Sequence, residues 1–441
     1  MKKIGLVSLG CPKNTVDSER VLGDLASSGF SLTPEEKNAE VIIVNTCGFI
    51  ESAKKESIDT ILEMAQHKKE GNCQQLIVTG CLAERYGQEL LDEIPEIDHL
   101  LGVGQYPQLK NIIAAEEGSL SKNHVATPAE YYESYTDRLL TTAFYTAYLK
   151  IAEGCSNRCA FCTIPKMRGQ FRSRSPESIL AEAENLAKKG VKEFNLISQD
   201  TTMYGFDLRM KDGLIRLLRE MSKVEGVEWL RLLYCYPTFL SSELIEFIAS
   251  EPKVCRYIDV PLQHTHDEML KSMKRQETEG GVRKMLEEVR LKIPDVALRT
   301  TFITGFPGET EEHFQHMVRF LCEVEFDHVG IFTYSDEEGT TAFDYPNRVP
   351  QEVKEQRRDT LMEFQREIAL RKNRERLGKV ERVLVEGFDP QENYIMTGRL
   401  ATQAPDIDGQ VLLEKCEAEP GEIINVKIKQ VAEYDLVAEP V

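Results

Sequence analysis

Two series of short apolar runs, each separated by amphipathic helical stretches, constrain the fold of this chain more than any other feature. In the first series we expect strands at 4–9, 41–44 and 76–79, with helices at 16–27 and 52–66 between them. Strands that alternate with helices are typical of parallel α/β architecture, because a parallel connection needs a crossover. Residues 1–118 are therefore predicted to form a parallel α/β domain.

The second series contains six predicted strands, at 145–151, 193–198, 229–234, 257–260, 298–304 and 329–333. Helices are expected between them, for example at 177–189 and 309–324, and a charged helix at about 351–376 follows. Six β/α units fall short of the eight in a closed barrel. We therefore predict an open (β/α)6 partial TIM-like barrel over residues 141–372, preceded by a polar linker at 118–141.

The tail changes character, because short β-rich runs at 380–385, 410–413 and 423–428 are separated by Gly, Pro and Asp. This composition is typical of a small antiparallel β-barrel, predicted for residues 374–441. The fold class is thus α/β with a β-barrel at the carboxyl end.

Eleven cysteines raise the question of compartment. The apolar run at the amino terminus is too short for a signal peptide, and no stretch approaches the roughly 18 apolar residues of a membrane helix. We therefore expect a cytoplasmic protein with no membrane partner. Thiols are kept reduced there, so clustered cysteines more often hold metal than form disulfides.

The tightest cysteine cluster is Cys155-x3-Cys159-x2-Cys162, directly after the first predicted strand of the second series. Three thiolates can hold three irons of a 4Fe-4S cube and leave the fourth iron open. Zinc is the alternative, but structural zinc takes four ligands and this loop offers no fourth Cys or His. His264 or His266 would have to supply it from far away in the sequence.

Three further cysteines, Cys11, Cys47 and Cys81, each follow a predicted strand closely. Such positions gather at one edge of a parallel sheet, so distant thiols can converge there. Cys73 precedes its strand and is expected at the opposite edge. The trio again suggests a cube with one open iron, and the alternative is three buried structural cysteines.

Strand ends at the carboxyl edge build the active site of a β/α barrel. The residues expected to face the cluster on this rule are Gln199, Asp200, Tyr236, Gln263, His264 and Gly305. Gly305 opens a Gly/Pro turn from strand into helix, whose backbone could approach a cofactor closely.

The segment Gly154 to Cys162, with Phe161 before the third cysteine, resembles the radical S-adenosylmethionine (SAM) superfamily. The resemblance implies that the open iron chelates SAM and that electron delivery yields a 5'-deoxyadenosyl radical, which takes hydrogen from unactivated carbon. On this basis we expect cofactor contacts from Phe161, Gln199, Gln263 and Gly305. Substrate contacts are expected from Asp200, Tyr236 and His264.

The segments around the other trio, Leu9 to Asn14, Asn45 to Ile50 and Thr79 to Leu82, resemble the amino-terminal domain of methylthiotransferases. The resemblance spans nearly the whole chain, in the order auxiliary domain, radical SAM domain and TRAM domain. It implies that Cys11, Cys47 and Cys81 hold an auxiliary 4Fe-4S cluster that carries the sulfur. It further implies two SAM molecules per turnover, one for the methyl group and one for the radical, with both open irons facing one cavity.

Two branches of that family compete, one that modifies adenosine in tRNA and one that modifies an aspartate β-carbon of ribosomal protein uS12. Four segments resemble the second branch: Gly48 to Ile50, Gln199 to Thr202, Pro261 to His264 and Ala404 to Gly409. The chain has a formal charge of −19, and residues 379–441 contain thirteen Asp/Glu against six Lys/Arg, a balance of −7. An acidic tail suits a basic ribosomal protein better than RNA, so tRNA is not expected as a partner.

The expected partners are uS12 or the small ribosomal subunit, an electron donor and a sulfur donor. A rival from another class is a non-catalytic, metal-stabilised protein that binds RNA or the ribosome. The remaining cysteines, Cys235, Cys255, Cys322 and Cys416, are expected to be structural.

Overall fold

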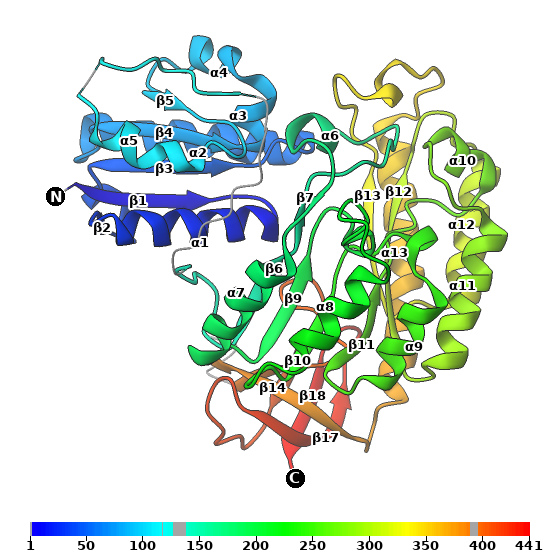
Figure 1. The fold of residues 1–441 in the computed structure, drawn as a ribbon. Coiled ribbons are helices and arrows are strands. Elements are labelled where there is room, and N and C mark those ends of the chain that lie inside the picture. Colours follow the sequence, from blue (N-terminus) through cyan, green and yellow to red (C-terminus); the bar gives the residue numbers. More distant parts are fainter. Residues whose placement is uncertain (1, 117, 127–137, 389–395) are drawn as a thin grey trace. The chain divides into compact units, whose positions relative to one another are not determined.

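The computed structural model describes residues 2–116, 118–126, 138–388 and 396–441 (Figure 1). The chain divides into two compact units. The first contains residues 1–141, 150–174 and 335–343, and the second contains 142–149, 175–334 and 344–441. Residues 127–137 of the predicted linker lie outside the described part, and the domain bounds drawn from the sequence remain predictions.

A five-stranded sheet with order β2-β1-β3-β4-β5 forms the centre of the first unit, and all of its strand pairs are parallel. Its strands are β1 (Lys3–Ser8), β2 (Ser31–Leu32), β3 (Val41–Thr46), β4 (Gln75–Gly80) and β5 (His99–Leu100). Its helices are α1 (Pro12–Ser27), α2 (Glu51–Glu70), α3 (Cys81–Tyr86), α4 (Gln88–Glu93) and α5 (Leu109–Ala114). The parallel α/β architecture is therefore confirmed, with two short edge strands added.

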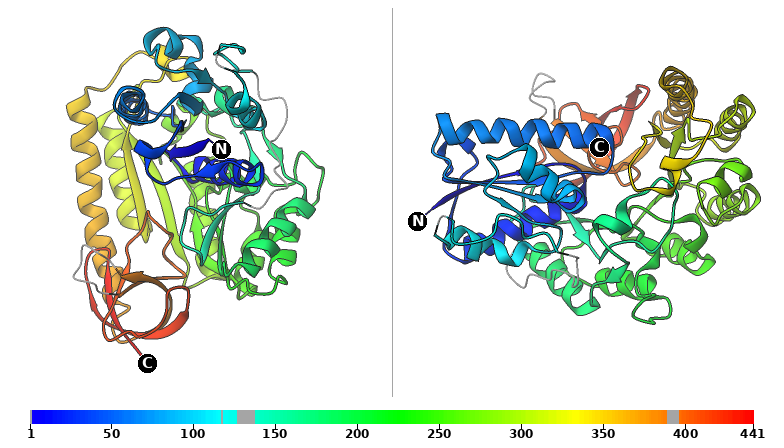
Figure 2. Two further views of the ribbon diagram at one scale, coloured as in Figure 1. Left: turned by 90° about the vertical axis from the view of Figure 1, so that its left-hand side faces the viewer. Right: turned by 90° about the horizontal axis from the view of Figure 1, so that it is seen from above.

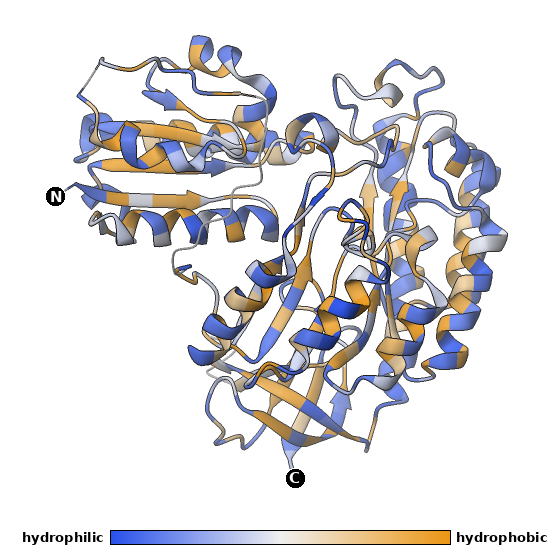
Figure 3. Ribbon diagram, in the orientation of Figure 1, coloured by the Kyte–Doolittle hydropathy of each residue, from blue (hydrophilic) through white to orange (hydrophobic). Residues whose placement is uncertain are grey.

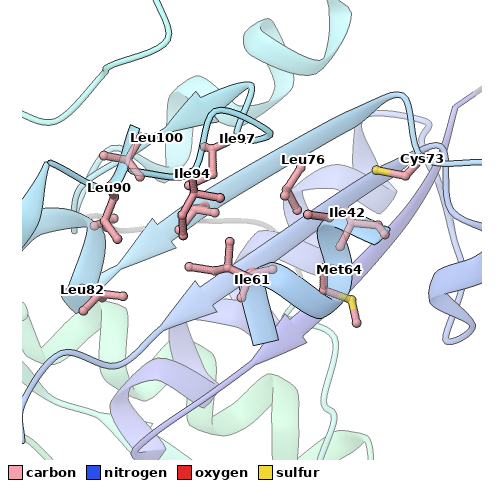
Figure 4. Close-up of a cluster of buried hydrophobic side chains, with 14 of the residues drawn as sticks. Ile42, Ile61, Met64, Cys73, Leu76, Leu82, Leu90, Ile94, Ile97 and Leu100 are labelled. Atoms are coloured by element: carbon pink, nitrogen blue, oxygen red, sulfur yellow. The ribbon is translucent and has the colours of Figure 1, made fainter. Parts of the chain in front are cut away.

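Apolar side chains cover both faces of this sheet, and helices lie on each side (Figure 2). On one face Ile42 and Leu76 pack with Ile61 of α2 (Figure 4). On the other face Ile43 packs in a cluster with Leu25 of α1. Successive residues of a strand point to opposite faces, so continuous apolar runs such as β3 are buried on both sides.

The second unit is built on a six-stranded open sheet with order β13-β12-β11-β10-β9-β6. Its strands are β6 (Thr146–Lys150), β9 (Glu193–Ile197), β10 (Trp229–Leu232), β11 (Val254–Asp259), β12 (Ala297–Thr304) and β13 (His328–Thr333). The helices are α7 (Pro176–Lys188), α8 (Gly213–Met221), α9 (Ser242–Ser250), α10 (Asp267–Ser272), α11 (Glu279–Lys292), α12 (Glu311–Val324) and α13 (Gln351–Arg374). The strands are largely hydrophobic and the helices are amphipathic (Figure 3). This is the pattern of a partial barrel with an outer layer of helices.

A closed five-stranded barrel with order β14-β15-β16-β18-β17 follows at the carboxyl end. Its strands are β14 (Val380–Phe388), β15 (Met396–Leu400), β16 (Val411–Leu413), β17 (Ile423–Val431) and β18 (Leu436–Pro440). The predicted barrel is confirmed, but β16 and β18 pair in parallel while the other pairs are antiparallel.

Buried charges join this barrel to the sheet inside the second unit. Glu193, the first residue of β9, is 0% exposed. Its carboxylate accepts hydrogen bonds from Arg231 of β10 at 2.9 Å and from Arg399 of β15 at 2.7 Å. Asp408 likewise accepts from Tyr257 Oη at 2.7 Å. None of the helices in the described part of the chain combines the length and apolarity needed to span a membrane.

Candidate functional site

Three cysteines of the first unit stand at the carboxyl ends of three neighbouring strands. Cys11 caps α1 shortly after β1, Cys47 directly follows β3, and Cys81 begins α3 directly after β4. These strands are adjacent and parallel, so their carboxyl ends share one edge of the sheet. A Cβ added to Gly10 would lie 2.7 Å from Cβ of Cys47, and one added to Gly48 would lie 3.1 Å from the carbonyl carbon of Cys81. The structure therefore brings the three cysteine segments together.

Two of these thiols, those of Cys47 and Cys81, are held in a setting that disfavours the free thiolate. The pKa of Cys81 is raised to about 12, chiefly by burial, against the opposing effect of Arg168 and with a further increase from Cys11 and Cys47. Burial also raises the pKa of Cys47. Metal binding displaces the thiol protons, and a cationic iron core offsets the repulsion between thiolates. The donor set therefore fits an iron-sulfur cluster.

The other trio lies in a short loop between β7 (Ala152–Glu153) and α6 (Ile164–Met167), also in the first unit. β7 pairs with β8 (Arg172–Ser173), which closes the base of the loop. Cys155 N donates to the Gly169 carbonyl at 3.1 Å, and Cys162 N donates to the Cys159 carbonyl at 3.2 Å. Cys155 is buried, whereas Cys159 and Cys162 are partly exposed. Because two of its cysteines are partly exposed, such a loop can hold a cluster that remains accessible to a small molecule.

Structural zinc takes four ligands, and the loop that bears Cys155, Cys159 and Cys162 offers no fourth Cys or His. Within the described residues, one set of three possible metal-ligand atoms lies within 4.8 Å of one another, namely His266, Glu268 and His313.

The two imidazole rings in the set of His266, Glu268 and His313 have no nitrogen lone pair available for a metal ion. Nδ1 of His266 accepts from the backbone N–H of Glu268 at 3.3 Å, and Nδ1 of His313 accepts from that of Thr310 at 3.2 Å. A neutral imidazole has one N–H, so Nε2 of each ring carries the proton and offers no lone pair. The two rings instead cap α10 and α12.

The strand-end residues predicted as contacts belong to the second unit, except Phe161, which lies partly buried in the cysteine loop. Gln199 and Asp200 follow β9 and Tyr236 follows β10. The Thr202 hydroxyl donates to Asp200 Oδ1 at 2.7 Å and accepts from Tyr236 N at 3.1 Å. One side chain thus connects the ends of two neighbouring strands.

Gln263, His264 and Gly305 form the corresponding group after β11 and β12. Gln263 has a left-handed φ of 69°, held by backbone hydrogen bonds to β12. His264 is 1% exposed, and its Nε2 lies 3.6 Å from Glu309 Oε2. The same carboxylate oxygen accepts from Gly305 N at 3.0 Å. The structure places these residues at the predicted edge, and their contacts to cofactor or substrate remain predictions.

Sequence reasoning missed a set of buried polar residues beside the first trio. They are Asn14 and Asp17 of α1, Lys150 and Glu153 before the second cysteine loop, and Arg168 after it. Of these residues, Lys150 alone could have been identified from the sequence as a buried charge, because it stands in an otherwise mainly apolar predicted strand. The others resemble surface residues in the sequence.

Three family models match separate parts of the chain. They are the Uncharacterized protein family UPF0004 at residues 3–102, the Radical SAM superfamily at 149–321 and the TRAM domain at 377–441. The radical SAM match contains the second cysteine loop, and the UPF0004 match contains the first trio.

The chain is also similar over its whole length to proteins named ribosomal protein uS12 methylthiotransferase RimO. The protein from Desulforamulus reducens is 49% identical, with 100% of this chain and 99% of that protein covered. The one from Geobacter sulfurreducens is 46% identical, with 99% and 98% covered. Among solved structures, the radical SAM methyltransferase TsrM from Kitasatospora setae matches with a TM-score of 0.58 at 15% identity over 77% of each chain, a likeness of fold alone.

Proposed function

The chain belongs to the RimO family of radical SAM methylthiotransferases, and on that premise we propose that it adds a methylthio group to the β-carbon of an aspartate in ribosomal protein uS12. The observation that carries this proposal is the identity of 46% to 49% along the whole chain with relatives that bear this name. Radical SAM enzymes work with a 4Fe-4S cluster and SAM.

We assign the two trios to two clusters. Cys155, Cys159 and Cys162 are the proposed ligands of the cluster that binds SAM. When bound, this cluster and SAM supply the radical that removes hydrogen from a carbon no side-chain base can deprotonate. Cys11, Cys47 and Cys81 are the proposed ligands of an auxiliary cluster that provides the sulfur, so that two SAM molecules are used per turnover.

The protein's own residues hold these groups and shield them. The hairpin of β7 and β8 closes the base of the loop of the second trio, and Cys81 of the first trio is buried while Cys11 and Cys47 are partly exposed. Both trios belong to one compact unit, which supports a direct transfer between their sites. Phe161, Gln199, Gln263 and Gly305 are proposed to contact the cofactor. Asp200, Tyr236 and His264 are proposed to contact the substrate.

Charge supports a protein substrate. The formal charge of −19, with −7 in residues 379–441, suits a basic ribosomal protein in free form or in the small subunit. The same charge disfavours tRNA, whose phosphates need a basic surface. We place the enzyme in the cytoplasm, where an electron donor and a sulfur donor must serve it.

Mass spectrometry of uS12 from cells with and without this gene tests the substrate. We expect uS12 to lose one methylthio group in the deletion strain and to regain it when the intact gene is restored. tRNA nucleosides from the same cells are the control and should not change. Loss of a methylthio nucleoside with unchanged uS12 would instead establish the tRNA-modifying alternative, which resembles MiaB.

Anaerobic reconstitution tests the two-cluster assignment. The intact chain should bind about eight irons and cleave SAM in the presence of dithionite, whereas Cys47→Ala should bind about four. Cys322→Ala is the matched control, since Cys322 is exposed and outside both trios, and it should keep about eight. A chain that holds metal but never cleaves SAM would support the non-catalytic alternative.

A further inference from the structure

A buried arginine from the second cysteine loop reaches the first cysteine trio. Arg168 ends α6, six residues after Cys162, and is only 1% exposed. It lies in the same compact unit as Cys11, Cys47 and Cys81. An arginine is rarely buried to this extent unless paired charges surround it, so its contacts define its role.

The first contact is with Asn14, which joins the cysteine segments. Nδ2 of Asn14 donates to the carbonyl of Leu9 at 2.8 Å and to that of Thr46 at 3.0 Å, just before Cys11 and Cys47. Its Oδ1 lies 3.9 Å from Sγ of Cys81 and accepts from Nη2 of Arg168 at 2.6 Å. One amide therefore touches all three segments, and Arg168 fixes its orientation.

The second set of contacts is ionic. Nη1 of Arg168 lies 2.9 Å from Glu153 Oε1 and 3.2 Å from Asp17 Oδ2. Lys150 contacts the same two carboxylates. Two cations thus face two carboxylates. Arg168 Nη2 and Cys81 Sγ also lie beside the same oxygen, Asn14 Oδ1, which places the guanidinium close to this sulfur.

We infer that Arg168 is a positioning residue for the auxiliary cluster, where its buried charge stabilises the thiolates of the first trio and raises the reduction potential of the cluster they hold. The inference rests on the proposed assignment of Cys11, Cys47 and Cys81 as cluster ligands. Arg168 stands six residues after Cys162, so the segment that bears the second trio also contributes a residue to the surroundings of the first.

Two substitutions should move the potential in opposite directions. Arg168→Gln removes a positive charge next to the thiolates, which disfavours the more negative reduced cluster and lowers the potential. Asp17→Asn removes a counter-charge of the guanidinium and should raise it. Opposite signs cannot arise from general loss of packing. We expect about a tenfold change in the ratio of reduced to oxidised cluster in each case, equal to about 59 mV for a one-electron couple.

The measurement is a redox titration of the reconstituted full-length enzyme, followed by electron paramagnetic resonance. The auxiliary cluster is identified as the signal that is missing in Cys47→Ala. Arg168→Lys keeps the charge and should hold the potential near that of the parent. Arg231→Gln is the matched control, because Arg231 is a 0% exposed arginine paired with a carboxylate in the second unit. It should not move the auxiliary signal.

The outcomes separate this inference from the proposed function. If Cys47→Ala lost no signal and no iron, the auxiliary cluster itself would be wrong. If that signal is present but stays in place in Arg168→Gln, or shifts the same way in Arg168→Gln and Asp17→Asn, the inference about Arg168 is overturned. An equal shift in Arg231→Gln would overturn it as well.

Discussion

Replacing Glu193 by glutamine should destabilise the second unit by about 3 kcal/mol, because two buried guanidinium groups lose the carboxylate they share. Glu193 and Arg231 are 0% exposed and Arg399 is 3% exposed. The carboxylate also accepts from the Thr146 hydroxyl at 2.9 Å. Glutamine has nearly the same shape, so the change removes charge and leaves packing in place.

Two independent routes give this magnitude. Removing one partner of a buried ion pair typically costs about 3 to 5 kcal/mol. The pKa of Glu193 gives the second route: burial acts to raise it, but Arg399 and Arg231 outweigh burial and lower it from 4.5 to about 2. One pKa unit is worth about 1.4 kcal/mol, so this depression corresponds to about 3 kcal/mol at neutral pH.

The sign of the pH dependence follows from the direction of the pKa. A carboxyl whose folded pKa lies below its unfolded value stabilises the fold above the unfolded pKa. For Glu193 the stabilisation is complete above about 4.5 and is lost as the pH falls towards 2. The difference between the parent and Glu193→Gln should therefore be constant from pH 6 to 8 and shrink in acid.

Hydrogen exchange followed by mass spectrometry is a suitable assay, because a chain with two units need not unfold in one step. Amides in β9 and β15 should exchange about a hundredfold faster in Glu193→Gln at pH 7, as about 3 kcal/mol implies. Glu220→Gln is the control, since Glu220 and Lys223 form an exposed pair at 2.7 Å with side chains 50% and 64% exposed. It should change exchange by less than about fivefold. An effect of Glu193→Gln no larger than this control would refute the reasoning.

Three further predictions concern the first unit. Cys155→Ala should abolish SAM cleavage. Cys47→Ala should keep some SAM cleavage but give no thiomethylated uS12. Formation of thiomethylated uS12 by Cys47→Ala would contradict the role of Cys47 in the auxiliary cluster. Gly10→Ala, with its new methyl 2.7 Å from Cβ of Cys47, should lose about half the iron, while Gly29→Ala has the same sign of φ in open space and should keep it. Burial raises the pKa of Glu84 to about 7, so the stability it contributes below pH 4.5 is lost as the pH rises through 7. The urea midpoint of Glu84→Gln should therefore rise relative to that of the parent as the pH increases above 5. A difference between the two midpoints that does not change with pH would show that ionisation of Glu84 does not affect stability.

Much of the fold could be predicted because many of its strands are short runs of mainly apolar residues. β3 is buried at every position, and a continuous apolar run this short is typical of a strand covered on both faces. The convergence of Cys11, Cys47 and Cys81 then follows from parallel topology alone. Because the three cysteines depend only on where the strands end, differences of up to two residues in the predicted bounds of β1, β3 and β4 leave their convergence unchanged.

Other features left no local trace. The two-residue strands β2 and β5 are too short to show a period, and the parallel pair of β16 and β18 depends on how the barrel closes. The membership of residues 150–174 in the first unit is a matter of long-range contacts. Periodicity describes neighbours along the chain and carries no information on partners this distant.

Lys150 and Glu193 show where the sequence nonetheless hinted at these partners. Each is a charged residue in a buried strand position, where an unpaired charge would be strongly unfavourable. Their networks include contacts across 133 and 206 residues, to Asp17 and Arg399. A misdocked arrangement would leave such charges buried without a partner, so the ion pairs select one assembly of segments that apolar packing alone would tolerate in several. The cysteine motifs therefore predict the chemistry, while the buried charges of Lys150 and Glu193 select which distant segments pair within each unit.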